Sequence, residues 1–291
     1  MIPVNLLPCI GSPSVIPYSI VACTTLASWM KIELITSIGT EERLPFTHTE
    51  ITRWTAEEFH RLVLGIKPKV AVFDCDGTLW SGDSGHGFMV WSMEQGLVSR
   101  STCDRIDTRY RAYLAGTVTE AEICGDMVQM YAGLHEDELR SAAATYFDKV
   151  VRGREFAEIK ALVTALRQAG TELWAVSSTN KWVVSEGVRD FGIPAEKVLA
   201  AEVSVKDGII TSEIVDVPTG SAKAVALQRV SLAHPDAVFG NSIHDLAMME
   251  IAAHAFPVNP SPALIEAATK RGWGYFRPQA AEDTVAAVGG E

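Results

Sequence analysis

Segments typical of buried strands alternate with segments typical of helices from Lys69 onward, and this order limits the fold more than any other feature. Apolar residues with helical spacing lead up to Gly170, and a second helical segment ends at Gly192. The strand-like segments are KVAVF (69–73), TELWAVS (171–177), DAVFG (236–240) and AFPV (255–258). Repeated β-α-β order predicts a mostly parallel sheet covered by helices on both faces.

The segment from residue 80 to residue 150 interrupts this order, because strand signals disappear while apolar residues keep helical spacing. We therefore expect a helical insert directly after the first core strand. It divides the chain into a core (67–79 and 151–291), a helical cap (80–150) and an N-terminal extension (1–66) of unknown role. The extension is Pro-rich at first, and its amphipathic end, TAEEFHRLVLGI, predicts one helix leading into the core.

The composition excludes several classes of protein. The chain has 291 residues, of which 47% are hydrophobic and 21% charged, as in a globular rather than a disordered protein. The net charge is −11, and no Lys/Arg-rich run occurs. Since phosphate contacts need clustered cations, nucleic acid is not expected as a partner.

No membrane span is expected, because four prolines within the first 17 residues would break a spanning helix there. The five cysteines form no CxxC pair, so neither a disulfide framework nor a zinc site is predicted, and a cytoplasmic setting is the expectation. The segment SIVAC (19–23) loosely fits a lipoprotein cleavage box. It leaves a lipoprotein or exported form as an alternative, although no basic residue precedes Lys31.

Polar side chains stand where the predicted strands end. Asp74 and Asp76 directly follow the first strand, where desolvation is costly and their charges repel each other. The later strand ends and one helix start supply Ser177, Ser178, Asn241, Asp245 and a single cation, Lys223. Ligands of an open parallel sheet bind at the carboxyl ends of its strands, so we expect these side chains to converge at one edge.

Four segments in order resemble the four motifs of the haloacid dehalogenase (HAD) superfamily. They are DCDGTLW (74–80), VSSTN (176–180), Lys223 after PTGSA, and GNSIHD (240–245). The resemblance covers about residues 69–278, and the helical insert between the first two motifs makes the phosphoserine phosphatase and phosphorylcholine phosphatase-like branch most similar. It implies an α/β, Rossmann-like, mostly parallel three-layer αβα core with a helical cap, and a phosphohydrolase activity.

The resemblance also implies catalytic roles. Asp74 would be the nucleophile that forms an aspartyl-phosphate, and Asp76 the general acid and then the base that activates water. Lys223 would neutralise charge on the nucleophile and the phosphoryl group. Phosphate contacts would come from the backbone at Gly77 and Thr78 and from the hydroxyl of Ser177, with Ser178 as a second candidate for that role.

The cofactor implied by the resemblance is Mg²⁺, held by the Asp74 carboxylate, the Asp76 backbone carbonyl, Asn241 and Asp245. The fourth motif departs from the family pattern, because it begins Gly-Asn where Gly-Asp is usual. The Asn241 side-chain oxygen can bind Mg²⁺ but brings no charge, so weaker metal binding is expected. Asp245 would bind the metal through water or support the site from behind.

The expected partner is a small phosphorylated metabolite. In this branch an acid nine residues after the nucleophile contacts the substrate ammonium, and Asp83 stands at that position. An amine-bearing phosphomonoester such as phosphoserine or phosphorylcholine is therefore expected, with Trp80 and Trp182 as candidates for an aromatic cage around the amine. His86 and His244 lie near the motifs. Asp83 could equally be a solvated loop acid.

Other functions stay open. Asp76 could cap a turn, Ser177 could be an ordinary strand-end hydroxyl, and Lys223 could be a surface lysine. A phosphotransferase of the same fold would pass the phosphoryl group to an acceptor other than water. A non-catalytic binding protein could keep the fold with a weakened metal site. The oligomeric state does not follow from the sequence.

Overall fold

The computed structural model describes residues 51–282, so the predictions for the first 50 residues, including the SIVAC segment, lie outside them. Its main sheet has six strands in the order β5-β4-β3-β2-β6-β7. They are β2 (Val70–Phe73), β3 (Glu172–Asn180), β4 (Val198–Lys206), β5 (Ile209–Asp216), β6 (Ala237–Gly240) and β7 (His254–Pro257). Neighbouring strands are parallel except β4 and β5, which form an antiparallel hairpin.

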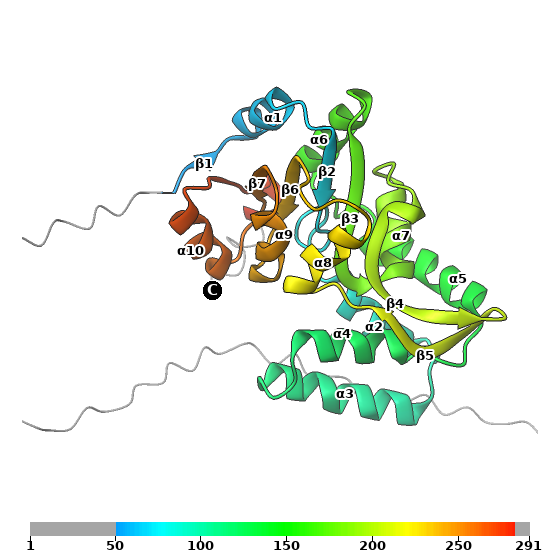
Figure 1. Ribbon diagram of the computed structural model, residues 1–291. Helices are drawn as coiled ribbons and strands as arrows, with labels where there is room; N and C mark the ends of the chain where they lie inside the picture. Colours follow the sequence, from blue (N-terminus) through cyan, green and yellow to red (C-terminus); the bar gives the residue numbers. More distant parts are fainter. Residues whose placement is uncertain (1–50, 283–291) are drawn as a thin grey trace, which may run out of the picture. The chain divides into compact units, whose positions relative to one another are not determined.

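Two layers of helices enclose this sheet (Figure 1). The helices of one face are α1 (Ala56–Gly65), α6 (Ala157–Gln168) and α7 (Lys181–Arg189), and those of the other are α8 (Ser221–Arg229), α9 (Leu246–Glu250) and α10 (Pro262–Arg271). Successive side chains of a strand point to opposite faces. Ala71 and Phe73 accordingly join the first hydrophobic cluster, whereas Val72 joins the second. The predicted fold class is confirmed.

The insert after β2 is helical, as expected. It consists of α2 (Ser84–Glu94), α3 (Arg100–Leu114), α4 (Glu120–Gln129), α5 (Glu136–Tyr146) and a π-helical turn, Phe147–Val151. Backbone hydrogen bonds draw its two connections together: Ser81 N donates to Arg154 O at 3.0 Å, and Phe156 N donates to Leu79 O at 3.0 Å. Two paired connections of this kind are suited to act as a hinge of the insert. The division into core and cap remains a prediction.

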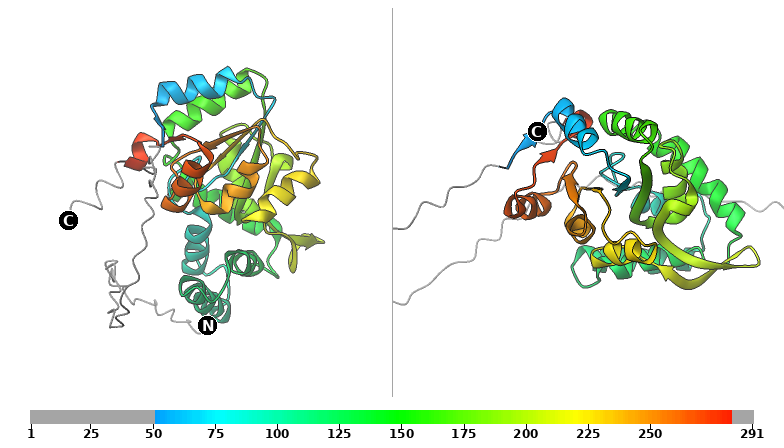
Figure 2. Two further views of the ribbon diagram at one scale, coloured as in Figure 1. Left: turned by 60° about the vertical axis from the view of Figure 1, so that its left-hand side comes forward. Right: turned by 45° about the horizontal axis from the view of Figure 1, so that its top comes forward.

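Part of the predicted N-terminal extension packs onto the core. Thr55 and Glu58 form a capping box that starts α1, and Phe59 and Val63 on its inner face are fully buried. The strand β1 (Arg53–Trp54) pairs in parallel with β8 (Tyr275–Phe276). Figure 2 shows α1 and α6 side by side on one face of the sheet.

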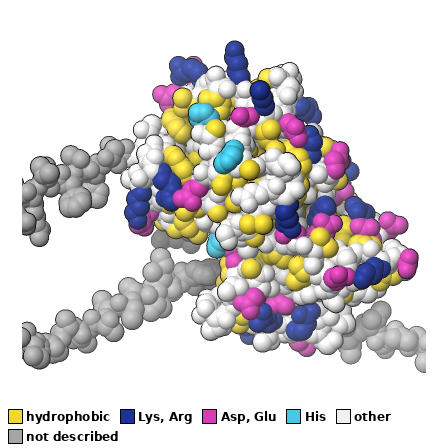
Figure 3. All heavy atoms as spheres, viewed as in Figure 1, with side chains coloured by type: hydrophobic (Ala, Val, Ile, Leu, Met, Phe, Trp, Pro, Cys, Tyr) yellow, Lys and Arg dark blue, Asp and Glu magenta, His cyan; other side chains and the backbone are white. Residues whose placement is uncertain are grey.

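None of the helices within residues 51–282 is long and apolar enough to cross a membrane. On the face drawn in Figure 3, acidic and basic side chains are interspersed with apolar ones.

The burial of Phe59 predicts a stability role for α1. Phe59 stacks on Phe276 with ring centroids 4.6 Å apart and meets Phe239 edge-on at 6.2 Å. Truncation should leave a cavity, so Phe59→Ala should lower the free energy of unfolding by about 3–5 kcal/mol in urea denaturation. Leu62→Ala is the control on the same helix, because Leu62 is 44% exposed, and should cost less than about 1 kcal/mol. If Phe59→Ala lowered the free energy of unfolding as little as Leu62→Ala, α1 would not be part of the folding unit.

Candidate active site

The site lies where β2 ends, and the turn that follows requires glycine. Gly77 has φ +76°, and a Cβ atom added there would lie 1.9 Å from the Asn241 Nδ2 atom. Both the backbone conformation and the approach of Asn241 therefore exclude a side chain. The turn is closed by a bond from Gly77 N to Trp80 O at 2.8 Å.

A buried ion cluster joins the ends of three segments that are far apart in the sequence. The Lys223 Nζ atom, on the first turn of α8, donates to Asp74 Oδ1 at 2.7 Å and to Asp245 Oδ1 at 2.6 Å. It also points at Val176 O, 3.4 Å away. The side chains of all three charged residues are at most 8% exposed. Two carboxylates thus share one ammonium group out of contact with water.

This burial shifts the protonation of the cluster. Burial and then repulsion from Asp245 raise the pKa of Asp74 to about 7, against the lowering effect of Lys223. Burial alone would lower the pKa of Lys223, but the charges of Asp245 and Asp74 outweigh it and raise that pKa above its ordinary value. Lys223 is therefore cationic, and because two carboxylates share this one cation the net charge of the cluster is not positive.

Each remaining oxygen of the cluster has a donor. Asp74 Oδ2 accepts from the Thr78 hydroxyl at 2.8 Å. Asp245 Oδ2 accepts from the backbone N–H groups of Asn241 and Ser242, at 2.8 and 2.9 Å. Asp245 is thus held within its own turn, the 3₁₀ segment Ile243–Asp245, and both of its oxygens face N–H donors.

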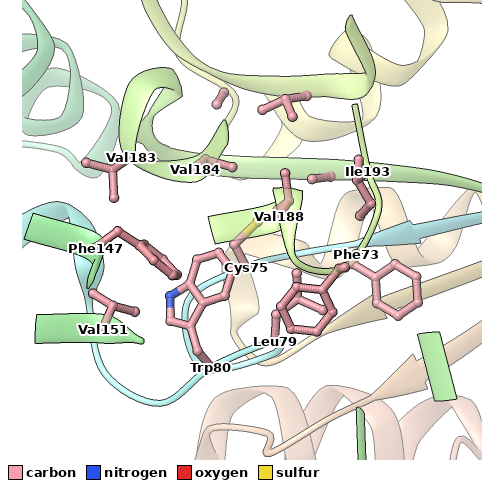
Figure 4. Packing of buried hydrophobic residues seen from close by; sticks show 14 of the residues in the cluster. Phe73, Cys75, Leu79, Trp80, Phe147, Val151, Val183, Val184, Val188 and Ile193 are labelled. Carbon is pink, nitrogen blue, oxygen red and sulfur yellow. The ribbon is translucent and has the colours of Figure 1, made fainter. Parts of the chain in front are cut away.

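Asp76 is oriented by three donors from three segments. Its Oδ1 atom accepts from Trp80 Nε1 at 2.6 Å and from Ser84 N, at the start of α2, at 2.8 Å. Its Oδ2 atom accepts from the Thr179 hydroxyl at 2.7 Å. Trp80 itself is fully buried and meets Phe147 edge-on at 5.4 Å, beside Cys75 (Figure 4).

The two serines of the second motif face different environments. Ser177 is 2% exposed, and its Oγ atom accepts from Thr179 N at 3.2 Å. Ser178 donates to Glu120 Oε1 at 3.5 Å and lines a pocket next to the site.

That pocket has a volume of about 270 Å³ and lies between the cap and the carboxyl end of β3. Helices α2, α3 and α4 form its walls, and Ser178, Thr179 and Asn180 form its base. Asp83, the N-cap of α2, accepts from His86 N at 2.8 Å and is among the lining residues. Partial desolvation and then the charge of Asp76 raise the pKa of Asp83 above its ordinary value.

One ion pair connects the cap to the core beside the pocket. Glu120 Oε2, on the first turn of α4, lies 2.5 Å from His244 Nδ1, on the turn that holds Asp245. Burial would raise the pKa of Glu120, but His244, the Thr219 hydroxyl and the charge of Lys223 together outweigh it and lower that pKa. The hydrogen bond with Glu120 raises the pKa of His244 above its ordinary value.

The expected tryptophan cage is wrong. Trp80 is buried in the core, and Trp182, 5% exposed, donates to Glu136 Oε1 at 3.2 Å; neither lines the pocket. Tyrosines line it instead. Thr179 and Glu120 are the polar residues that sequence reasoning missed. Thr179 lay within a quoted motif, whereas nothing in the sequence showed that the start of α4 would lie over the sheet edge.

Comparison with known proteins assigns the chain to a family. The model of the haloacid dehalogenase-like hydrolase family matches residues 71–250. A probable phosphatase of Mycobacterium tuberculosis is 28% identical over 229 residues, 75% of this chain and 79% of that protein. A histidinol-phosphatase of Neisseria meningitidis is 22% identical over 215 residues, 70% of this chain and 96% of that protein.

The fold has solved counterparts. A structure of a probable phosphoserine phosphatase from Vibrio cholerae superposes with a TM-score of 0.53 at 14% identity, over 77% of this chain and 65% of that one. It supports the fold alone. The family match covers more than half of the chain and includes Asp74, Ser177, Lys223 and Asn241, so the resemblance and the prediction of a hydrolytic enzyme are confirmed. The chain belongs to the haloacid dehalogenase-like hydrolase family.

Proposed function

We propose that the protein is a Mg²⁺-dependent phosphatase that hydrolyses a small phosphomonoester through an aspartyl-phosphate. The observation that carries this proposal is the pair of aspartates after β2, one joined to a buried lysine and the other to a hydroxyl. These two environments suit two different tasks. Phosphoryl transfer needs positioning and charge stabilisation, which such a cluster can provide.

Asp74 is proposed as the nucleophile. A carboxylate oxygen attacks phosphorus, and the bond to the leaving oxygen breaks. Lys223, fixed against Asp74 by Asp245, stabilises negative charge on the carboxylate and the phosphoryl oxygens. The Thr78 hydroxyl holds the second oxygen of Asp74, which limits rotation of the carboxylate. Ser177, Gly77 and the backbone of Thr78 remain proposed phosphate contacts.

Asp76 is proposed as the general acid and base. Its Oδ1 atom is held by two N–H groups, which can only donate. Its Oδ2 atom faces the Thr179 hydroxyl, which can donate or accept, so Oδ2 is the atom on which a proton can come and go. It would protonate the leaving oxygen and later take the proton of the attacking water.

The residues present suit Mg²⁺ in chemistry. The proposed donors are the Asp74 carboxylate, the Asp76 carbonyl and the Asn241 side chain, all hard oxygen ligands. Within residues 51–282 no group of three or more His, Cys, Asp or Glu side chains is arranged to hold a metal, consistent with a set that depends on an amide and a carbonyl. Asp245 would support this set rather than join it, because both of its oxygens already face N–H donors. When bound, the ion would supply the positive charge that the cluster lacks.

The substrate proposed is amine-bearing. Asp83 lies on the pocket next to Asp76, where the leaving group would emerge. Names of relatives agree with a phosphatase, and one of them is a histidinol-phosphatase. A cytoplasmic setting remains a prediction.

The nucleophile is tested by Asp74→Asn. An amide cannot form the acyl-phosphate, so Mg²⁺-dependent hydrolysis of p-nitrophenyl phosphate should fall at least about a thousandfold. Asp207→Asn is the matched control, because Asp207 lies at the β4–β5 turn with φ 53°, a conformation that asparagine accepts. Activity that survives Asp74→Asn contradicts the mechanism. A wild-type chain without Mg²⁺-dependent turnover favours the non-catalytic alternative.

The metal role of Asn241 is tested by changing its charge. Asn241→Asp adds a charged ligand and should tighten Mg²⁺ binding by about tenfold, while Asn241→Ala should weaken it. Isothermal titration calorimetry with MgCl₂ measures both without turnover. If the aspartate variant bound Mg²⁺ no more tightly than the wild type, Asn241 would not be a ligand.

The ion cluster predicts a stability effect of Lys223→Met. Two buried carboxylates would lose their shared cation, so the free energy of unfolding at pH 7.5 should fall by about 3 kcal/mol or more. Adding Asp245→Asn removes one of those charges and should restore part of the loss. Urea denaturation of the two single variants and the double variant measures the coupling. Additive losses would contradict the assignment of one shared cluster.

A further inference from the structure

The pocket beneath the cap continues from the proposed proton-transfer atom. Thr179 lines it and at the same time donates to Asp76 Oδ2 at 2.7 Å. A leaving group that takes a proton from Asp76 must therefore extend into this pocket. Its volume of about 270 Å³ is at the lower end for small-molecule sites, so the leaving group is small.

Carboxylates line the pocket on two sides, and one of them is paired with His244. Asp83 comes from the start of α2 and Glu120 from the start of α4. Glu120 Oε2 faces His244, whereas Oε1 accepts a long hydrogen bond from the Ser178 hydroxyl at 3.5 Å. The thiol of Cys124 between them is neutral, because burial, with Glu120 and Asp83, raises its pKa to about 12.

Aromatic rings also line the pocket. Tyr110 and Tyr113, one turn apart on α3, lie with ring centroids 5.9 Å apart. His86 stacks on Tyr110 at 4.4 Å. Faces of aromatic rings attract organic cations, and most strongly where water is excluded.

The described lining contains no lysine or arginine. A substrate carboxylate would need such a partner, because an unpaired buried charge is costly. His86 is the one basic residue of the lining, and it lies against Tyr110 and next to Asp83. His244 is paired with Glu120, and the exposed Arg154 adjoins Gly82 outside the lining.

We propose that the leaving group is a small amino alcohol without a carboxylate, whose ammonium lies between Asp83 and Glu120 against the ring of Tyr113. This inference rests on the proposed phosphatase function. It distinguishes between the amine-bearing substrates considered above. Phosphoserine is disfavoured, because it carries a carboxylate for which the lining holds no partner. Glu120 and Tyr113 then determine specificity alongside Asp83.

Three phosphomonoesters test the proposal on the wild-type protein with Mg²⁺: phosphoethanolamine, O-phosphoserine and propyl phosphate. Phosphoserine adds a carboxylate to phosphoethanolamine, and propyl phosphate replaces its amine with a methyl group. The kcat/KM for phosphoethanolamine should exceed each of the others by about tenfold or more. A preference for phosphoserine, or equal rates with propyl phosphate, overturns the inference.

Variants identify the residues responsible. Asp83→Asn and Glu120→Gln should each lower the ratio of kcat/KM for phosphoethanolamine to that for propyl phosphate by about tenfold, and the ratio cancels any general loss of activity. Met127→Lys places a cation in the lining and should shift preference toward phosphoserine. Ala121→Lys is the control, because Ala121 is exposed on the same helix and lies outside this pocket, and it should leave the preference unchanged. Unchanged ratios in the first two variants overturn the inference.

The failure of this inference differs from the failure of the proposed function. Turnover of p-nitrophenyl phosphate without amine preference contradicts the leaving-group assignment alone. Absence of Mg²⁺-dependent turnover on every substrate contradicts both.

Discussion

The contact of Lys223 with Asp74 and Asp245 is the interaction on which the rest of the site depends. A buried carboxylate is costly, and two within reach of each other are more so. The lysine compensates them only because the start of α8 and the turn after β6 meet over the end of β2. That meeting is a property of the parallel sheet, whose central strands β3, β2 and β6 all end at one edge.

Trp80 connects the hydrophobic core to Asp76. Its ring is buried against Phe147 of the insert (Figure 4), while its Nε1 atom donates to Asp76. Gly187 of α7 leaves room for this pair, because a Cβ atom there would lie 2.7 Å from the Trp80 ring. Packing of the insert on the core therefore orients the residue proposed to move protons. A repacked core at Phe147 would affect chemistry as well as stability.

The helical insert forms most of the wall of the pocket. Asp83, Glu120 and the tyrosines of α3 come from three helices, and they line one pocket with the end of β3 only because the insert folds over the sheet edge. The Glu120–His244 pair connects this wall to the turn that holds Asp245. The wall of the pocket and the ion cluster are thus joined by one short path of polar contacts.

Periodicity in the sequence was enough to predict the strands and helices of the core. These elements leave local patterns in the sequence, and so does the clustering of polar residues at strand ends. The positions of Asp74, Asp76 and Lys223 at strand ends and a helix start follow from these patterns. Tertiary structure alone decided that Trp80 serves Asp76 rather than a substrate cage, and that Glu120 lies over the site. The physical reason is that these contacts join residues from separate elements, and their register depends on how whole helices pack. No pattern along the chain records that packing.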